Sequence, residues 1–426
     1  MNKIVIVGGG FAGITLASRL MNKKGTAVTL VDSNNYYFFP PLLYQVATGF
    51  LEPSAISYPY RKFLRGKKNI KFRMADLLEI VPAENKVILS NGEIHYDSLI
   101  LATGAASNYF GLENVKNNSL PMKTMSDALA LRNILLQRLE EASRSDSISE
   151  KRKLITIVVA GAGPTGVELS GMFAEMKRNI IRKDYPELSG EGLGEIILID
   201  GADAVLSPMS EKSQQYSYKA LRRMGVTIKL NVTVKDFVND TVVLSDGSTI
   251  VTKNLIWSAG VAAKTFTGFS KEQYGRGTRL KVDEYNCVEG FQNIYALGDT
   301  CLQVHEPLFS HGHPQVAQVA LQQAKNLANN LMRPKTAWKP FHYLDKGSMA
   351  IIGRNKAVAD LPKPKIHFDG LIAWFVWLFI HVASLINYRN RLRTLYNWLG
   401  AYFSKDQAFR MIIRPKQKTE NRFVHS

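Results

Sequence analysis

Three glycines near the amino terminus have a spacing that is suited to holding a phosphate group. Gly8-x-Gly10-x-x-Gly13 directly follows the apolar run 3–7, and a second apolar run ends at Asp32, 24 residues after Gly8. In such a strand–turn–helix–strand unit, the first glycine makes the turn, the second lets the backbone approach a pyrophosphate, and the third packs helix against strand. The helix amino terminus attracts the phosphates, and the acidic residue accepts from a ribose hydroxyl. These residues predict a dinucleotide site.

The same pattern occurs again 153 residues later and ends at Asp200, 39 residues after its first glycine. This copy is about 15 residues longer than the first, and we assign the extra residues to segment 177–194. No arginine follows Asp200 closely, and a carboxylate there repels a 2′-phosphate, which favours NADH over NADPH. The turn of this second motif consists of Gly161, Gly163, Pro164, Thr165 and Gly166.

Two motifs of this kind predict two bound dinucleotides. Each half of the chain ends in an apolar run with a small-residue turn, at 99–105 and 255–261, and a third run ends in Gly298-Asp299. This order resembles the flavoprotein pyridine-nucleotide oxidoreductases, in which the aspartate binds the ribityl chain of FAD. The resemblance implies that the first half, completed near residue 300, holds FAD. The second motif, nested inside it, then holds the nicotinamide cofactor.

The cysteines narrow the choice of electron acceptor. Disulfide reductases need a close cysteine pair soon after the first motif, and sulfide:quinone reductases need several cysteines. The chain has only Cys287 and Cys301, which we predict to be buried, inert thiols. Three histidines, His305, His311 and His313, have no carboxylate or cysteine at ligand spacing, so we predict no metal site.

The carboxy-terminal fifth of the chain carries most of the net positive charge. The whole chain has a net charge of +18, and residues 333–426 hold 17 Lys+Arg against 5 Asp+Glu. An uncharged run, 371–388, is too polar towards its end to be more than a marginal spanning helix. After it, apolar residues at alternating spacings of four and three predict an amphipathic helix on an anionic bilayer, with a core helix or a dimer interface as the alternative. We expect Trp374, Trp377 and Trp398 at the headgroup boundary. A nucleic-acid partner is disfavoured, because contact with phosphates does not require such an apolar face.

A glutamine-rich segment, 313–331, predicts a helix between the Gly-Asp turn and this tail. Gln318 and Gln322 are four residues apart and share one face. Their neutral amides are suited to binding quinone carbonyls, although a solvated helix face explains the same periodicity.

Three segments, 35–51, 317–324 and 346–360, resemble the type II NADH dehydrogenases, which are single-subunit NADH:quinone oxidoreductases. The likeness covers essentially the whole chain. It implies that Gln45 and Thr48 surround the flavin, that Gln318 and Gln322 lie on the quinone side, and that Lys346 lies near the flavin pyrimidine edge. A lysine there would stabilise an anionic reduced flavin.

The candidate site residues fall into three groups. The predicted FAD site comprises Gly8, Gly9, Gly10, Phe11, Ala12, Gly13, Asp32, Pro41, Gln45, Thr48, Leu77, Thr103, Gly104, Asp299, Ala317, Gln318 and Lys346. The predicted NADH site comprises Gly161, Gly163, Pro164, Thr165, Gly166, Glu168, Asp200 and Gly260. The predicted quinone site comprises Gln318, Gln322 and Met349, and the candidate catalytic residues are Glu168, Gln318 and Lys346. Glu168 also has a structural explanation, because the helix dipole favours a carboxylate in the first turn.

The predicted fold class is α/β, with two Rossmann-like domains and a C-terminal amphipathic membrane-anchoring region. The NADH domain is inserted in the FAD domain, with the polar segment 143–153 as a linker. The predicted domains are the first part of the FAD domain, the NADH domain, the second part of the FAD domain and the membrane-association domain: 1–150, 151–275, 276–335 and 336–426.

The predicted activity is oxidation of NADH through FAD and reduction of a membrane quinone. Because no multi-helix membrane domain is present in the sequence, we expect no proton pumping. The expected partners are a quinone, a bilayer surface on the cytoplasmic face of the cell membrane and a second copy of the chain. Two alternatives stay open, a soluble NADH-dependent reductase of a small redox protein and a flavin-containing redox sensor.

Overall fold

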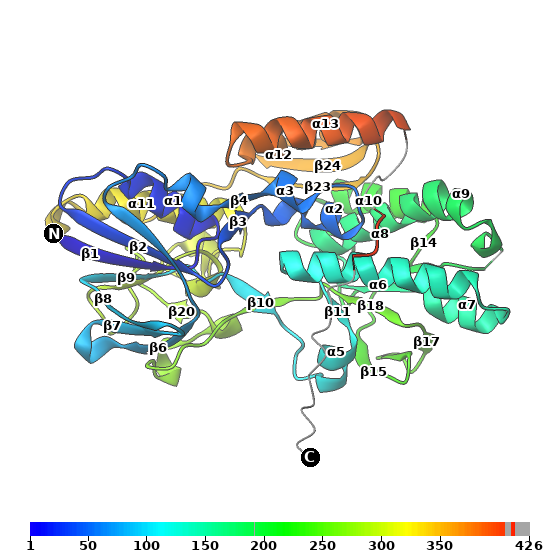
Figure 1. The fold of residues 1–426 in the computed structure, drawn as a ribbon, viewed down its shortest axis with the longest axis horizontal. Coiled ribbons are helices and arrows are strands. Elements are labelled where there is room, and N and C mark those ends of the chain that lie inside the picture. The colour runs from blue at the N-terminus through cyan, green and yellow to red at the C-terminus, as the bar shows by residue number, and fades with distance from the viewer. Residues whose placement is uncertain (191, 405–409, 414–426) are drawn as a thin grey trace, which may run out of the picture.

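Two parallel five-stranded sheets form the two lobes of the molecule (Figure 1). The computed structural model describes residues 1–190, 192–404 and 410–413. The first sheet has the order β21 (Ile294–Ala296), β9 (Ser98–Leu101), β1 (Asn2–Val7), β2 (Thr26–Asp32) and β5 (Ile70–Met74). The second sheet has the order β11 (Leu120–Pro121), β18 (Asn254–Trp257), β12 (Ile157–Ala160), β13 (Ile196–Ile199) and β14 (Val226–Lys229). The predicted α/β class with two Rossmann-like sheets is confirmed.

The strand before each glycine motif is the central strand of its sheet. In β1, Ile4 and Ile6 enter one hydrophobic core while Val5 and Val7 enter another on the opposite face. Strands that are buried on both faces need continuous apolar runs, and the runs before both motifs meet that requirement. The two motifs therefore lie at equivalent positions, at the carboxyl ends of β1 and β12.

Helices cover both sheets. In the first lobe, α1 (Phe11–Leu20) packs against α11 (Ala317–Leu331), which begins four residues later than the start of the predicted helix. Three short helices follow in the first part of the chain, α2 (Leu43–Ala47), α3 (Pro53–Ile56) and α4 (Tyr60–Phe63), and of these α2 packs against helices of the second lobe. The second lobe has α5 (Glu113–Asn118), α6 (Met125–Ser143), α7 (Ile148–Ile155), α8 (Pro164–Met176), a π-helical turn (Lys177–Ile181), α9 (Arg182–Asp184) and α10 (Glu211–Arg223). The π turn and α9 occupy the predicted insertion between α8 and β13.

Each lobe also carries a three-stranded antiparallel sheet, and small two-stranded sheets join the remaining segments. The three-stranded sheets are β6 (Leu77–Val81), β7 (Lys86–Leu89) and β8 (Gly92–His95) in the first lobe, and β15 (Val234–Val238), β16 (Thr241–Leu244) and β17 (Thr249–Val251) in the second. The two-stranded sheets pair β3 (Tyr36–Phe38) with β4 (Ser57–Pro59), β20 (Leu280–Lys281) with β22 (Cys301–Leu302), and β10 (Ala105–Ser107) with β19 (Val261–Ala263). β10 and β19 run between the lobes and pair antiparallel, so both connections between the lobes are held together (Figure 1).

The carboxy-terminal region lies above the middle of the molecule, where the two lobes meet, in Figure 1. It consists of the antiparallel strands β23 (Ser348–Gly353), β24 (Lys356–Pro362) and β25 (Lys365–Asp369), followed by α12 (Gly370–Ser384) and α13 (Tyr388–Ser404). β23 packs on α8 of the second lobe, and α13 packs on α3 of the first. Residues 405–409 and 414–426 of the predicted membrane-association domain lie outside the described residues.

The predicted linker at 143–153 is wrong in part, because half of it is the helix α7. The side chain of Ser147 accepts from the Glu150 backbone N–H, and Lys153 pairs with Glu150 at 2.8 Å. A serine followed three residues later by a glutamate is a helix-start signal, which the polar composition of the segment concealed. In addition, β11 already pairs with β18, so the chain enters the second sheet before the predicted boundary at residue 150.

Candidate active site

The two glycine turns have the same geometry. Gly8 and Gly161 have φ values of 99° and 103°, and each donates its N–H at 2.8 Å to the carbonyl of the residue before the acidic residue of its motif, Val31 or Ile199. This left-handed conformation favours glycine because a side chain would clash with the following carbonyl. The turn therefore brings the amino termini of α1 and α8 to the carboxyl edge of their sheets.

In each motif, the third glycine is closely packed against the turn, whereas the second glycine faces open space. A Cβ atom on Gly13 or Gly166 would lie 1.8 or 1.7 Å from the carbonyl oxygen of Gly8 or Gly161. By contrast, no atom lies within 4 Å of a Cβ placed on Gly10 or Gly163. The open space in front of the second glycine, at a helix amino terminus, is where a pyrophosphate fits.

The acidic residue of each motif is held by its own turn. Asp32 Oδ2 accepts from the Gly9 N–H at 2.6 Å, and Asp200 Oδ2 accepts from the Ala162 N–H at 2.5 Å. Burial raises the pKa of Asp32, and the hydrogen bond from Gly9 opposes that rise. Both carboxylates are therefore fixed beside the phosphate position, where a ribose hydroxyl can reach them. Sequence spacing predicted these two acidic residues, but it could not show that each also accepts a hydrogen bond from the backbone of its own glycine turn.

Asp299 is a half-buried carboxylate at the Gly298 turn, and its oxygens can accept from a hydroxyl-bearing ligand. Burial raises its pKa, while the positive charges of Lys123 and Arg279 lower it. Within the described residues no side chain or backbone group donates to its carboxylate, and only its backbone carbonyl is bound, by Gln315 at 3.2 Å. Its half-buried oxygens are therefore free to accept from a ligand, which fits the predicted role of Asp299 in binding the ribityl hydroxyls of FAD.

The turn before Asp299 is held by a residue that the sequence analysis missed. The buried Gln323 accepts from the Gly298 N–H at 2.7 Å and donates to the Cys301 thiol at 3.1 Å. Burial raises the pKa of the Cys301 thiol to about 11, as expected for an inert cysteine. Gln323 lies next to Gln322 in the sequence, and only the helix phase decides which of the two points into the core.

Thr103 and Gly104 contact this turn, and other candidate FAD residues lie in β6, α1 and α11. Thr103 Oγ1 lies 3.2 Å from Thr300 Oγ1, and Thr300 Oγ1 donates to the Gly104 carbonyl at 3.4 Å, so the small-residue turn and the Gly-Asp turn are joined. Leu77 is half-buried at the start of β6. The residues Phe11, Ala12 and Ala317 lie in the first turns of α1 and α11, which pack together.

The proline-rich segment places Gln45 and Thr48 inside the molecule. Pro41 is half-buried, whereas Gln45 and Thr48 are buried in and just after α2. Thr48 donates its hydroxyl to the Tyr44 carbonyl at 3.0 Å. Gln45 donates to the Tyr44 hydroxyl at 2.9 Å and accepts from the Trp398 indole N–H at 2.7 Å. The flavin role of this segment stays a prediction.

The predicted quinone glutamines are engaged with backbone. Gln318 donates to the Gly347 carbonyl and accepts from the Lys346 N–H, both at 3.0 Å. Gln322 makes the same pair of bonds with Leu344, at 2.9 and 3.0 Å. Each side-chain amide therefore holds the backbone of the segment before β23 by two hydrogen bonds. The sequence analysis predicted only a quinone-binding role for these glutamines. One N–H of each side chain remains for a ligand.

Glu168 lies just beyond the first turn of α8 and is buried, so burial rather than the helix dipole governs its carboxyl group. Burial raises its pKa well above the ordinary value, against a hydrogen bond from the Ile351 backbone N–H. The ionised form of Glu168 would raise the pKa of the buried Tyr44 hydroxyl, because α2 packs on α8. Met349 is half-buried on β23, and the Lys346 side chain is exposed. The structure thus places Glu168 beside the segment that carries Gln45.

We expect Glu168→Gln to stabilise the protein progressively as pH rises. The folded protein keeps a proton on Glu168 above the ordinary pKa of 4.5, whereas the unfolded chain releases it, so rising pH favours unfolding of the wild type. The gain should grow by up to about 1.4 kcal/mol per pH unit below the folded pKa and vanish below the unfolded pKa. Urea unfolding at several pH values measures it, and a pH-independent difference would contradict a neutral Glu168.

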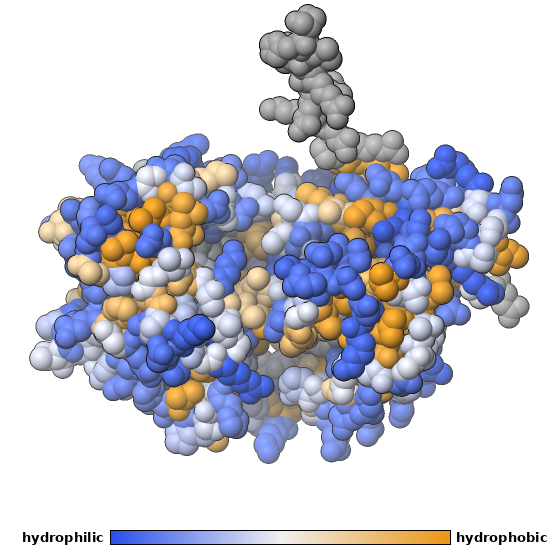
Figure 2. All heavy atoms as spheres, turned by 90° about the horizontal axis from the view of Figure 1, so that it is seen from below, coloured by the Kyte–Doolittle hydropathy of each residue, from blue (hydrophilic) through white to orange (hydrophobic). Residues whose placement is uncertain are grey.

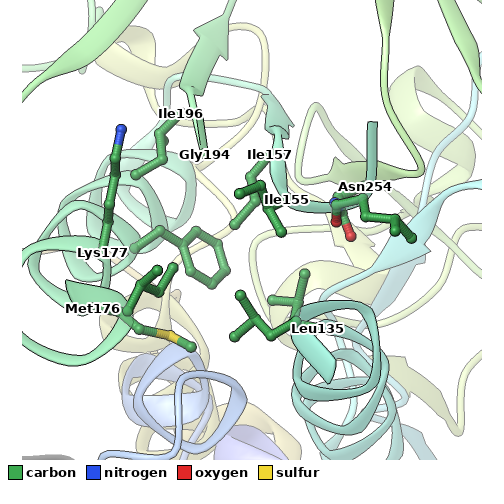
Figure 3. A pocket seen from close by; sticks show the side chains of 12 residues that line it. Leu135, Ile155, Ile157, Met176, Lys177, Gly194, Ile196 and Asn254 are labelled. Atoms are coloured by element: carbon green, nitrogen blue, oxygen red, sulfur yellow. The ribbon is translucent and has the colours of Figure 1, made fainter. Parts of the chain in front are cut away.

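The pocket in Figure 3 lies at the other end of the second sheet. Ile157, Ile196 and Asn254 begin their strands there, while the glycine turn follows the carboxyl end of β12. Its lining is apolar apart from Asn254 and Lys177, and burial lowers the pKa of Lys177. Ligands of such sheets bind outside the carboxyl ends of the strands, so this pocket is separate from the dinucleotide sites.

The histidine loop before α11 is an aromatic cluster. His313 pairs with Glu306 at 3.0 Å and packs between Phe309, Phe341 and Tyr343. Burial lowers its pKa, which favours the neutral ring. No group of three or more His, Cys, Asp or Glu side chains suited to a metal ion occurs in the described part of the chain.

Comparison with known proteins identifies the family. Residues 2–324 match the pyridine nucleotide-disulphide oxidoreductase family, and residues 346–405 match the family described as NDH2 C-terminal domain. Type II NADH:quinone oxidoreductase Ndh of Mycobacterium tuberculosis is 34% identical over 420 residues, which cover 95% of this chain and 88% of that protein. The chain belongs to the type II NADH:quinone oxidoreductases. It is therefore a flavin-dependent enzyme that oxidises NADH and reduces a quinone.

More distant relatives agree with this assignment. The internal alternative NAD(P)H-ubiquinone oxidoreductase A1 of Arabidopsis thaliana is 28% identical over 442 residues, covering 95% of this chain and 85% of that protein. The solved structure of NDH2 from Plasmodium falciparum in complex with NADH has a TM-score of 0.87 at 22% identity, covering 97% of this chain and all of that one. The second likeness shows the fold of this NADH:quinone oxidoreductase, including its C-terminal region.

Proposed function

We propose that the first glycine turn binds FAD, that the second binds NADH, and that the quinone enters from a bilayer on which α12 and α13 lie. The observation that supports the two nucleotide assignments is the duplicated turn, with open space before Gly10 and Gly163 and an unbound carboxylate at Asp299. FAD accepts two electrons as a hydride from NADH and passes them to the quinone. The reaction moves no proton across the membrane in this proposal.

The residues of the chain would bind and orient the reactants. Asp32 and Asp200 would each bind a ribose, and Asp299 would bind the ribityl hydroxyls. Lys346 would lie at the pyrimidine edge of the flavin, where a positive charge favours the reduced anion. The neutral carboxyl of Glu168 is suited to holding a proton close to the acceptor. Gln318, Gln322 and Met349 would line the approach of the quinone.

The support for a bilayer surface is that α13 has its apolar side outward. Its inner face carries the buried polar residues Asn390 and Thr394, whereas Leu395, Tyr396 and Leu399 are exposed. The exposed apolar residues of the two helices are Leu371, Ile372, Phe375, Phe379, Ile380, Tyr388, Leu392, Leu395, Tyr396, Leu399 and Phe403. On the opposite face of the molecule, apolar side chains form separate small groups among hydrophilic ones (Figure 2). A contiguous apolar patch marks an interaction site, and Arg389, Arg391 and Arg393 beside it would favour an anionic leaflet.

The tryptophans do not lie where the sequence analysis expected them. Trp377 and Trp398 are buried and Trp374 is half-buried, because their rings pack between the helices and the lobes. Leucine, phenylalanine and tyrosine side chains form the outer surface instead. Among the described residues, no helix has the length and apolar content needed to cross a membrane. This pattern supports a helix pair lying on the bilayer surface, which is the finer part of our proposal.

We expect the double substitution Leu395→Glu and Leu399→Glu to release the enzyme from anionic lipid vesicles. Both side chains are about half exposed, and removing two leucines from lipid contact should weaken binding roughly 100-fold at about 1.5 kcal/mol each. Vesicle co-sedimentation measures binding. NADH oxidation with ferricyanide, a water-soluble acceptor, should continue, while reduction of a quinone embedded in vesicles should fall.

A matched control is Val251→Glu, which replaces an equally exposed apolar side chain on β17, away from α12 and α13. Unchanged vesicle binding by the leucine variant would contradict the bilayer surface. Truncation before Asp369 is a poorer test, because it would uncover core residues that pack against α12. We further propose a homodimer on the cytoplasmic face of the membrane, on the family resemblance, and light scattering of detergent-solubilised protein measures its mass.

A further inference from the structure

The inner face of α13 is a row of polar contacts to the first lobe. Asn390, Thr394 and Trp398 are four residues apart and therefore share one side of the helix. Asn390 donates to the Ala55 carbonyl at 2.8 Å and to the Ser57 carbonyl at 3.0 Å, next to α3. These contacts orient the outward apolar face and attach the helix to the segment that follows α2.

The last contact of the row reaches a candidate flavin residue. The Trp398 indole N–H donates to Gln45 Oε1 at 2.7 Å, and Gln45 Nε2 donates to the Tyr44 hydroxyl at 2.9 Å. All three side chains are at most 6% exposed, so no solvent competes for these bonds. A chain of two buried hydrogen bonds therefore connects α13 to α2.

The indole fixes the direction of this chain. An indole N–H can only donate, so the Gln45 oxygen must face Trp398 and its NH₂ must face Tyr44. Tyr44 then accepts from Gln45, and its own hydrogen is free to point elsewhere. Without the indole N–H, the carboxamide can rotate by half a turn and accept from the Tyr44 hydroxyl instead. The polarity of a buried hydroxyl thus depends on one bond from α13.

Tyr44 belongs to α2, which packs on α8 and its acidic residues, the buried Glu168 and the half-buried Glu175. Burial raises the pKa of the Tyr44 hydroxyl, and the ionised forms of Glu168 and Glu175 would raise it further. Glu175 accepts from the Arg354 N–H and is also affected by Arg178, Lys356 and the Arg354 side chain. A reversed hydroxyl dipole at Tyr44 would therefore change the electrostatic environment of Glu168.

We propose that Trp398 is a positioning residue for quinone reduction, because its indole N–H orients the Gln45 carboxamide and, through it, the Tyr44 hydroxyl beside Glu168. This inference rests on the proposed placement of Gln45 and Glu168 at the acceptor side of the flavin. It makes α13 part of the active-site support as well as the proposed bilayer contact. Hydride transfer from NADH does not depend on this chain of hydrogen bonds.

The test compares Trp398→Phe with Trp377→Phe in the full-length, detergent-solubilised enzyme. The two rings are neighbours with centroids 5.6 Å apart, and both are buried, but the Trp377 indole N–H has no hydrogen-bond partner among the described residues. The same substitution therefore removes a used donor in one case and an unused donor in the other. Anaerobic stopped-flow absorbance follows bleaching of the flavin by NADH and its return on addition of a short-chain quinone.

We expect Trp398→Phe to slow the return of flavin absorbance on quinone addition about tenfold, equivalent to about 1.4 kcal/mol. Bleaching by NADH and turnover with ferricyanide should stay within about twofold of wild type, as should all rates of Trp377→Phe. Gln45→Met should reproduce the slowing while leaving the indole in place, and the double variant should add little to it.

Equal slowing in both tryptophan variants would assign the effect to packing and overturn the proposal, as would an unchanged quinone step in Trp398→Phe. If Trp398→Phe does not fold, Gln45→Met serves as the test. Quinone reduction at the wild-type rate in Gln45→Met would then overturn the proposal. Failure of the proposed function is recognised separately, because the wild-type flavin would then not be reoxidised by any quinone.

Discussion

Gly13→Ala is expected to give protein that is purified without bound flavin. A Cβ at this position would lie 1.8 Å from the Gly8 carbonyl oxygen, so α1 would have to move away from the turn that it follows. Overpacking against backbone costs roughly 1–3 kcal/mol or more, and the movement also displaces the helix amino terminus from the phosphates. Visible absorbance of the purified protein measures flavin content, and chromatography of the flavin released from wild type identifies it as FAD.

The control for this prediction is Gly10→Ala. No atom lies within 4 Å of a Cβ at Gly10, so the flavin-free form of this variant should have the same melting temperature as the flavin-free wild type. Its methyl group would occupy the space proposed for the pyrophosphate, so it should bind FAD more weakly than wild type. A full flavin complement in Gly13→Ala would exclude this turn as the flavin site. Loss of flavin in Gly166→Ala instead would reverse the assignment of the two halves.

The second large effect is expected for Asp200→Asn, which should weaken the preference for NADH over NADPH. The carboxylate accepts from the Ala162 and Ala202 backbone N–H groups, at 2.5 and 2.7 Å, and the amide oxygen of asparagine can keep only part of this arrangement. A hydrogen bond from a ribose hydroxyl to a charged acceptor contributes about 1.5–3 kcal/mol, or roughly 10- to 150-fold. The ratio of kcat/KM for NADH to kcat/KM for NADPH should therefore be lower in Asp200→Asn than in wild type by roughly 10- to 150-fold.

Asp32→Asn is the matched variant in the first half. Asp32 accepts from the Gly9 N–H in the same way, at 2.6 Å. If the halves are assigned correctly, this variant should lose flavin affinity and keep its NADH/NADPH ratio. A change of the nucleotide ratio in Asp32→Asn, with none in Asp200→Asn, would show that the two nucleotides occupy the opposite sites.

The local patterns of the chain predicted the two glycine turns correctly. Each depends on contacts between residues close in sequence, such as Gly13 against Gly8, or on one strand next to another, such as β1 beside β2. Steric exclusion at a tight turn allows almost only glycine, so the residue types reveal the geometry. For the same reason, burial of β1 on both faces could be predicted from its uninterrupted apolar run.

The C-terminal helices show where such patterns are insufficient. The amphipathic period of α13 predicted two faces but not which face is buried, and the polar face is the inner one because backbone carbonyls of Ala55 and Ser57 need donors there. The tryptophans were expected at the surface for their chemistry, yet Trp377 and Trp398 fill the space between helices and lobes. Tertiary contact, rather than residue type, decides such positions.

The sequence by itself determined the sheets, both glycine turns and the acidic residue that ends each motif, because these depend on steric limits and contacts within one βαβ unit. Only the tertiary structure decided that Gln318 and Gln322 clamp the backbone before β23, that Glu168 is buried beside Tyr44, and that Trp398 contacts Gln45. Trp398 and Gln45 are 353 residues apart, and a hydrogen bond between such distant residues has no local signature. It forms only because α13 folds back over the segment that contains α2 and α3.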